Sequence, residues 1–322
     1  MLSHQVIAAA ANVTASSAVA DAGAVYVLHG ILGCARNWSA FSKRIASLGR
    51  GWDKLPFVLV DQRCHDASRD FAQTSGRPNT IDSCAQDLAE LAVKSGRAPA
   101  VIIGHSMGGK VAMRFQQLFP DLCKQFWILD AMPGLGAPIA KDTTPEPDSS
   151  QRLFAFVEHH PGPFPSRKAV HSLAQEFGFS HSTAAWLTSR TVRQKHNVVG
   201  SNDHVVGWGF DVHGVQELRH SYMELDVWNV LDAPLPPASG SPATVDFVYG
   251  AQSKRWNDVL LSRLLSTDSM QRQDGHESVA DTHNTVRVHR LDRAGHWLHA
   301  DNPDGLLQIF QRFPPRLSSD HA

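Results

Sequence analysis

Short apolar runs recur along the chain, separated by stretches in which apolar residues return at helical spacing. In one such stretch Trp38, Phe41, Ile45 and Leu48 fall on one face of a helix. Near-continuous apolar strands alternating with amphipathic helices are typical of an α/β protein with a mostly parallel sheet and helices on both faces. We therefore predict strands at residues 4–9, 24–28, 56–60, 100–103, 126–129, 245–249 and 285–291, and helices at residues 38–48, 81–93, 110–119 and 306–313.

This alternation is interrupted between Pro133 and Ser241. The interrupting segment is rich in aromatic residues and has helical spacing at residues 150–158, 168–176 and 182–191. A helical insertion between two strands of one sheet predicts a cap over the edge at which ligands bind. We assign residues 1–132 and 242–322 to the α/β core and residues 133–241 to a helical cap that precedes the penultimate core strand. The polar residues 267–284 predict a solvated loop.

Composition narrows the function classes. A net charge of −1 without a long basic run argues against nucleic acid as a partner. No apolar stretch approaches the ~20 residues of a transmembrane helix. The four cysteines are scattered, without metal-site spacing, and predict free thiols in a reducing compartment. Residues 1–22 contain no Lys or Arg, which fits neither a secretory signal nor an Arg-rich transit peptide. We expect an intracellular protein, cytoplasmic or organellar, without a metal or cofactor; its oligomeric state stays open.

The segment Gly104-His105-Ser106-Met107-Gly108 follows a predicted strand and precedes a predicted helix. Strand, G-x-S-x-G and helix are the context of a nucleophile elbow, a sharp turn that exposes a serine hydroxyl at a helix N-terminus. The helix end stabilises an anion formed there. Ser106 is therefore the predicted nucleophile; the alternative is a glycine-rich turn with an incidental serine.

A serine hydroxyl needs a base, which an acid orients. In hydrolases built around such an elbow the chain order is serine, acid, histidine. Among the 18 histidines, His296 follows the last predicted strand within Ala294-Gly295-His296-Trp297 and is the predicted base. His299 is its nearest rival, and we expect it to support the site or to be exposed.

Two places suit the acid. The loop after the penultimate strand carries Ser253 where an aspartate is common. Asp130 directly follows four apolar residues, where a carboxylate is costly to bury without a partner, and His296 would supply that partner. We predict Asp130 as the acid; Asp258 and Asp246 remain alternatives, as does a role for Asp130 in capping a turn.

Backbone donors and pocket residues complete the predicted site. The amides of Met107 and Ile31 should form the oxyanion hole, with His29 holding the loop 29–33 in place. We expect the polar residues 61–65 and Lys110 to be structural. Most cap aromatics should pack the cap onto the core, and a few should line an apolar pocket that favours apolar acyl groups over charged ones. The candidate pocket residues are Leu32, Phe154, Phe179, Trp186, Trp208 and Trp297.

Several motifs together resemble the α/β-hydrolase superfamily along nearly the whole chain. Besides the elbow Gly104-His-Ser-Met-Gly-Gly-Lys110, they are His29-Gly-Ile-Leu-Gly33 with Asn37-Trp38, Asp61-Gln-Arg-Cys-His65, Trp127-Ile-Leu-Asp-Ala-Met-Pro133 and Gly295-His-Trp-Leu-His-Ala-Asp-Asn-Pro-Asp-Gly305. The likeness is strongest to a small esterase-like group with bacterial, mitochondrial and plant-plastid members. Two cap segments look most like the plant-type members: Pro165-Ser-Arg-Lys168 and Gly207-Trp-Gly-Phe-Asp211.

The resemblance implies an α/β-hydrolase fold and hydrolysis of esters or thioesters with acyl chains. In that group the acid belongs to the strand directly after the elbow helix, which supports Asp130. The chain departs from the group at Asp66, where glycine is usual. If that position needs a positive φ, aspartate tolerates it better than most residues, although the loop and substrate access can shift.

The leading hypothesis is a serine hydrolase acting on a small-molecule ester or thioester. A small-molecule receptor with an intact triad is the main alternative, and acyl transfer or C–C bond cleavage is another. Epoxide hydrolase and haloalkane dehalogenase chemistry is disfavoured, because those resemblances would place an aspartate at Ser106.

Overall fold

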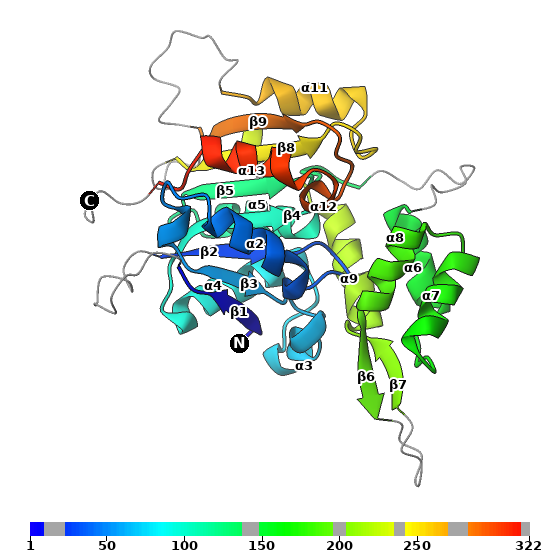
Figure 1. Cartoon of the computed structure of the whole chain (residues 1–322). Coiled ribbons are helices and arrows are strands. Elements are labelled where there is room, and N and C mark those ends of the chain that lie inside the picture. Colours follow the sequence, from blue (N-terminus) through cyan, green and yellow to red (C-terminus); the bar gives the residue numbers. More distant parts are fainter. Residues whose placement is uncertain (10–22, 137–147, 196–203, 235–241, 270–282, 317–322) are drawn as a thin grey trace.

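The computed structural model describes residues 1–9, 23–136, 148–195, 204–234, 242–269 and 283–316. A seven-stranded sheet in the order β1-β3-β2-β4-β5-β8-β9 forms its centre (Figure 1). β1 runs antiparallel to β3, and the other neighbouring strands are parallel. The strands are β1 His4–Ile7, β2 Ala24–Leu28, β3 Phe57–Val60, β4 Pro99–His105, β5 Gln125–Leu129, β8 Thr244–Gly250 and β9 Thr285–Leu291.

Helices cover both faces of the sheet. In β2, Tyr26 and Leu28 face one apolar core, while Val25 and Val27 face the other, because side chains alternate along a strand. α4, α5 and α11 pack in the first core, and α2 and α13 pack in the second. The core helices are α2 Ser39–Ala46, α3 Phe71–Ser75, α4 Ile81–Ser95, α5 Met107–Leu118, α11 Asp258–Ser266, α12 Leu298–Asp301 and α13 Pro303–Arg312, with short 3₁₀ turns η1 Ala35–Trp38, η2 Trp52–Lys54 and η3 Asp66–Ser68.

Each predicted core element is present, with ends that lie within three residues of the prediction, and the α/β class is confirmed. Thr80 caps α4 by accepting a hydrogen bond from the Ser83 amide. The loop 267–284 is described only at its two ends, since residues 270–282 lie outside the described residues. At those ends the prediction of a solvated loop is wrong: Thr267, Asp268 and Asn284 are buried. Asn284 can be buried because its side chain has hydrogen-bond partners: it donates to Val230 O and accepts from the Ala243 amide.

Between β5 and β8 the chain forms a cap-like layer beside the sheet (Figure 1). Its three predicted helices are present as α6 Ser150–His159, α7 Arg167–Glu176 and α8 His181–Ser189. The third is shorter than predicted, because Thr191 already begins a strand. The sequence analysis missed the antiparallel hairpin of β6 Thr191–Lys195 and β7 His204–Trp208, as well as α9 Val212–Glu224 and α10 Asn229–Asp232.

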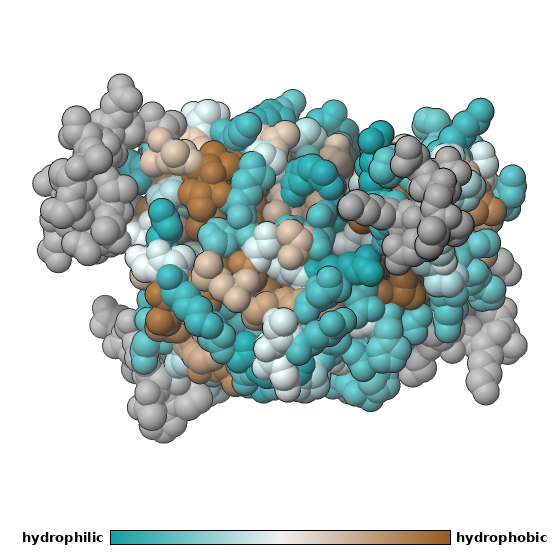
Figure 2. Space-filling view, turned by 90° about the horizontal axis from the view of Figure 1, so that it is seen from below, coloured by the Kyte–Doolittle hydropathy of each residue, from teal (hydrophilic) through white to brown (hydrophobic). Residues whose placement is uncertain are grey.

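The surface of the described residues is mainly hydrophilic, and apolar residues form small separate patches in the view of Figure 2. Large exposed apolar side chains, such as Val93 and Val259, lie far apart in the sequence. No helix in these residues combines the length and apolar character needed to cross a membrane.

Lys110, in α5, connects this helix by hydrogen bonds to the end of α9 and to Gly134 at the start of the inserted segment. Its side chain is fully buried, and Nζ donates to Gly134 O at 2.7 Å and to Tyr222 O and Leu225 O at 2.8 Å each. Nζ also lies 4.2 Å from the centre of the Tyr222 ring. Burial lowers the pKa of Lys110 to about 8. The ammonium therefore satisfies carbonyls at the end of α9 that have no helical partner.

Replacing Lys110 by methionine should remove these bonds while keeping an apolar side chain of similar length. Three buried or partly buried carbonyls would lose their donor, so the free energy of unfolding should fall by about 3 kcal/mol or more. Denaturant titration measures this loss. Lys43→Met, at an exposed position of α2, is the control and should change stability by less than about 0.5 kcal/mol. Equal stability of the Lys110 and Lys43 variants would contradict the role.

Candidate active site

Ser106 lies in the sharp turn between β4 and α5, with φ 52° and ψ −115°. The turn needs glycine on both sides. A Cβ on Gly104 would lie 2.2 Å from Gly108 O, and one on Gly108 would lie 2.4 Å from Leu28 O. Any larger residue would force the backbone apart. The serine therefore has the strained backbone and the helix-start position of a nucleophile elbow.

The structure brings Asp130 and His296 together. His296 Nδ1 lies 2.8 Å from Asp130 Oδ2. Asp130 directly follows β5, has a φ of 46° and is fully buried. It also accepts hydrogen bonds from Ser253 Oγ at 2.7 Å, Trp256 Nε1 at 2.9 Å and the Gly250 amide at 3.2 Å. Ser253, which occupies the late-loop position, thus donates to Asp130.

The alternative acids lie elsewhere. Asp246 binds Arg287 and His289 across the pair β8–β9. Asp258 is exposed at the start of α11. The rival base His299 stacks on Trp38 with ring centres 4.1 Å apart, and its buried Nδ1 has no partner among the described residues.

The electrostatics of the pair suit a charged acid beside a neutral base. Burial alone would raise the pKa of Asp130, but hydrogen bonds and charge from His296, with the Trp256 and Ser253 donors, hold it below its usual range. Burial and the nearby Arg255 cation lower the pKa of His296 to about 4. At neutral pH Asp130 is therefore ionised and His296 is free to accept a proton.

A cavity of about 670 Å³ contains Ser106 and His296. Four candidate pocket residues line it: Leu32, Phe154, Trp186 and Trp297. The prediction is wrong for Phe179 and Trp208, which are buried inside the cap instead. Phe179 packs against Phe156 and Phe177, whereas Trp208 stacks on Phe210 and donates to His160 O. Lys254 and Arg255 also line the cavity, a cationic side that sequence analysis missed.

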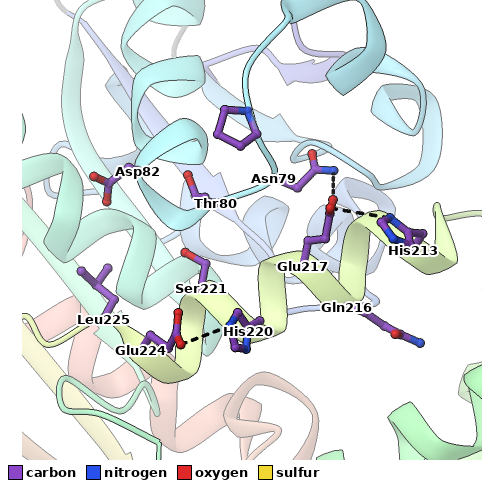
Figure 3. Close-up of a pocket in the computed structure, with 11 residues that line it drawn as sticks. Asn79, Thr80, Asp82, His213, Gln216, Glu217, His220, Ser221, Glu224 and Leu225 are labelled. Atoms are coloured by element: carbon purple, nitrogen blue, oxygen red, sulfur yellow. Dashed lines mark hydrogen bonds and ion pairs between the residues drawn. The ribbon is translucent and has the colours of Figure 1, made fainter.

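Two other hollows lack Ser106. One, of about 260 Å³, shares Trp186, Trp297 and His105 with the first cavity. The other is a groove of about 700 Å³ between α9 and the residues that precede α4 (Figure 3). In it Glu217 accepts from Asn79 Nδ2 at 2.7 Å, and His220 pairs with Glu224 on its own helix. The Asn79–Glu217 hydrogen bond connects α9 to the core.

The predicted oxyanion loop approaches the serine closely. A Cβ on Gly30 would lie 3.2 Å from Ser106 Cβ, so glycine lets the backbone next to Ile31 come near the nucleophile. Ile31 and Leu32 line the cavity, and Met107 is the first residue of α5. The buried side chain of His65 accepts from the Leu32 amide at 3.0 Å, which fixes the far side of the loop.

The residues around this loop form the structural network that the sequence predicts. His29 Nε2 accepts from the Gln62 amide, and Nδ1 is 2.8 Å from Gly30 O. Burial lowers the pKa of both His29 and His65, so each ring is neutral. Arg63 is fully buried and pairs with Asp87 at 2.7 Å.

Arg190 connects the cap to the same loop. It follows α8, and its side chain is 1% exposed. Nε donates to Leu32 O at 2.8 Å, Nη1 lies 2.6 Å from Cys34 Sγ, and both terminal nitrogens lie 3.3 Å from Asp66 Oδ2. Asp66 has a φ of 42°, so the position does need a positive φ. The departure from glycine thus supplies a counter-ion for a buried cap arginine.

Cys34, Asp61 and Asp66 bring three possible metal ligands within 4.8 Å of one another. The guanidinium of Arg190 already contacts two of these residues. Its positive charge disfavours a metal cation there. All four cysteines are free, as the sequence predicts, and all four are buried.

Asp66→Asn should keep the positive φ but leave Arg190 buried without its counter-ion. The free energy of unfolding should fall by about 2 kcal/mol. Arg36 is 69% exposed and also pairs with Asp66, so Arg36→Gln is the control and should cost less than about 1 kcal/mol. Denaturant titration of Asp66→Asn, Arg190→Gln and the double variant gives their coupling energy. Strict additivity of the two changes would contradict the pairing.

The sequence matches the alpha/beta hydrolase family over residues 25–309. It is 23% identical over 290 residues to the sn-1-specific diacylglycerol lipase ABHD11 of Mus musculus, covering 90% of this chain and 80% of that protein. It is 33% identical over 119 residues to the abhydrolase domain-containing protein C22H12.03 of Schizosaccharomyces pombe, which covers 37% of this chain and 40% of that protein.

The fold is similar to that of a solved marine microorganism esterase. The TM-score is 0.69 at 19% sequence identity, and the match covers 97% of this chain and 99% of the esterase. Together with the parallel sheet, the elbow and the cap, the match over residues 25–309 shows that the chain belongs to the alpha/beta hydrolase family.

Proposed function

We propose that the protein is a serine hydrolase that cleaves carboxylic ester or thioester bonds through an acyl-enzyme. The observation that carries this proposal is the hydrogen bond between His296 and the buried Asp130 beside the cavity that contains Ser106. The lipase and esterase named above act on esters, as their names state, which supports the same reaction class for this chain.

In the proposed mechanism His296 takes the proton of Ser106 as its oxygen attacks the carbonyl carbon. Asp130 orients the ring and stabilises its charged form. The amides of Ile31 and Met107 hold the oxyanion. His296 then protonates the leaving alcohol or thiol, and in the second half it activates the water that releases the acid.

The substrate's acyl group would lie along the apolar wall formed by Leu32, Phe154, Trp186 and Trp297. We further propose that residues 133–241 act as one cap over a core of residues 1–132 and 242–322. The four buried free thiols support a reducing, intracellular compartment. We also propose that the chain is most similar to the plant-type members of the group, on the basis of the two cap motifs at residues 165–168 and 207–211.

Asp130→Asn should lower kcat by about 10³-fold or more for an ester such as p-nitrophenyl butyrate, because the amide cannot stabilise the charged His296 ring. Asp258→Asn, at an exposed site, should leave kcat unchanged and is the matched control. Far-UV circular dichroism checks that both variants fold. Comparable kcat values for the two variants would contradict Asp130 as the acid. Undetectable turnover of a broad ester panel by the wild type would instead favour the receptor alternative.

The pH profile tests the base. His296 must be neutral to accept a proton, and its pKa of about 4 lies below the usual 6.5. The value of kcat/KM should therefore stay level from neutral pH downward and fall only as the pH approaches about 4. Buried histidines with lowered pKa also bind protons more readily when unfolded, so stability decreases between about pH 6.5 and 4. Short pH-jump assays separate the two effects. An acid limb near pH 6.5 would contradict the assignment.

A further inference from the structure

Arg255 presents a cation to the cavity that contains Ser106 and His296. Its side chain is 25% exposed, and its Nε lies 4.0 Å from Asp130 Oδ2. Within the part of the chain that the structure describes, it makes this one long ion pair and no side-chain hydrogen bond. A guanidinium has five N–H donors in a planar fork, so most donors of this cavity-lining side chain have no hydrogen-bond acceptor among the described residues.

Asp130 does not need Arg255 to be satisfied. Its Oδ1 accepts from the Gly250 amide and Trp256 Nε1, and its Oδ2 accepts from Ser253 and binds His296. Four partners already occupy the two oxygens of this buried carboxylate. The hydrogen bonding of Asp130 therefore does not explain why a cation stands at this position.

When no anion is bound in the cavity, the positive charge of Arg255 disfavours the protonated form of His296 that the proposed reaction requires. The cation lowers the pKa of His296 and so disfavours the charged ring on which the reaction depends. Other groups at the cavity are Lys254, Asp148 and Asp301; Asp148 accepts from the Ser180 amide and Asp301 from the Gly295 amide. The neutral rings of His105 and His299 lie beside His296 and add no charge. A substrate anion paired with Arg255 would remove the opposition.

We propose that Arg255 forms an anion subsite for the leaving group, so that the substrates join an uncharged apolar acyl group to an alcohol or thiol bearing a carboxylate or phosphate. The proposal rests on the proposed hydrolase function. Carboxylate and phosphate match the planar guanidinium fork. The proposed function places the acyl group along the apolar wall of the cavity, which leaves the cationic side with Lys254 and Arg255 for the leaving group.

Two matched substrate pairs test the subsite. In the first, 4-acetoxybenzoate and 4-acetoxybenzamide differ by one negative charge on the leaving group. In the second, p-nitrophenyl hydrogen adipate and p-nitrophenyl hexanoate differ by one negative charge on the acyl group. The wild type should prefer the first anion over its neutral partner by about 10-fold in kcat/KM. Arg255→Gln should abolish this preference and leave the acyl-pair ratio unchanged.

Arg290→Gln is the control for general electrostatic attraction. Arg290 is 65% exposed and pairs with Asp292, so the variant removes the same charge outside the cavity and should keep both ratios. A second readout is the acid limb for the neutral ester 4-acetoxybenzamide, which should move to higher pH in Arg255→Gln because the ring is easier to protonate. A merely structural role of Arg255 would change neither ratio.

Hydrolysis of all four esters with equal ratios in wild type and Arg255→Gln would overturn the anion subsite and leave the proposed function intact. Loss of preference in the acyl pair alone would overturn the leaving-group assignment. Failure of the wild type to hydrolyse any of the esters would overturn both proposals.

Discussion

The hydrogen bond between Asp130 and His296 joins two segments that are 166 residues apart in the chain. It depends on the parallel sheet, which ends β5 beside β4 and carries the loop after β9 to the same edge. The buried Asp130 carboxylate needs hydrogen-bond donors, because a charge without partners is unfavourable in a protein interior. Four donors, from the end of β8 and the loops that follow β8 and β9, satisfy it, and both loops are thereby held beside Asp130.

Two basic side chains connect the cap to this edge of the sheet. Lys110 reaches from the elbow helix to carbonyls at the end of α9, and Arg190 reaches from the end of α8 to the carbonyl of Leu32. Both side chains are buried, and each donates at least one hydrogen bond to a backbone carbonyl. The position of the cap is thus linked to the backbone around the proposed nucleophile. Arg255, by contrast, faces the cavity, which is why a role toward substrate suits it.

Elements that depend on neighbouring residues could be predicted from the sequence pattern. The apolar runs predict the strands. The glycines around Ser106 predict the sharp turn, because the backbone nearby leaves no space for a larger side chain. Asp130 was also predictable, since a carboxylate directly after an apolar strand needs a partner. The hairpin of β6 and β7 was missed because its first strand, Thr191–Lys195, is mostly polar.

Long-range contacts could not be predicted in the same way. Trp208 and Trp186 are both cap aromatics, yet one packs inside the cap and the other lines the cavity, a difference set by tertiary packing. Arg190 had no signal, because its partners Leu32, Cys34 and Asp66 are more than 120 residues away. Asp66 was noticed only as a departure from glycine, and its counter-ion explains it.

In the proposed mechanism Ser106 is a nucleophile that His296 activates. Peptide mass spectrometry after reaction with a fluorophosphonate tests it most directly, because the probe bonds covalently to an activated serine. We predict one adduct, on Ser106, that forms rapidly in the wild type and is absent from Ser106→Ala. An unlabelled wild type, or equal labelling of Ser106→Ala, would contradict it.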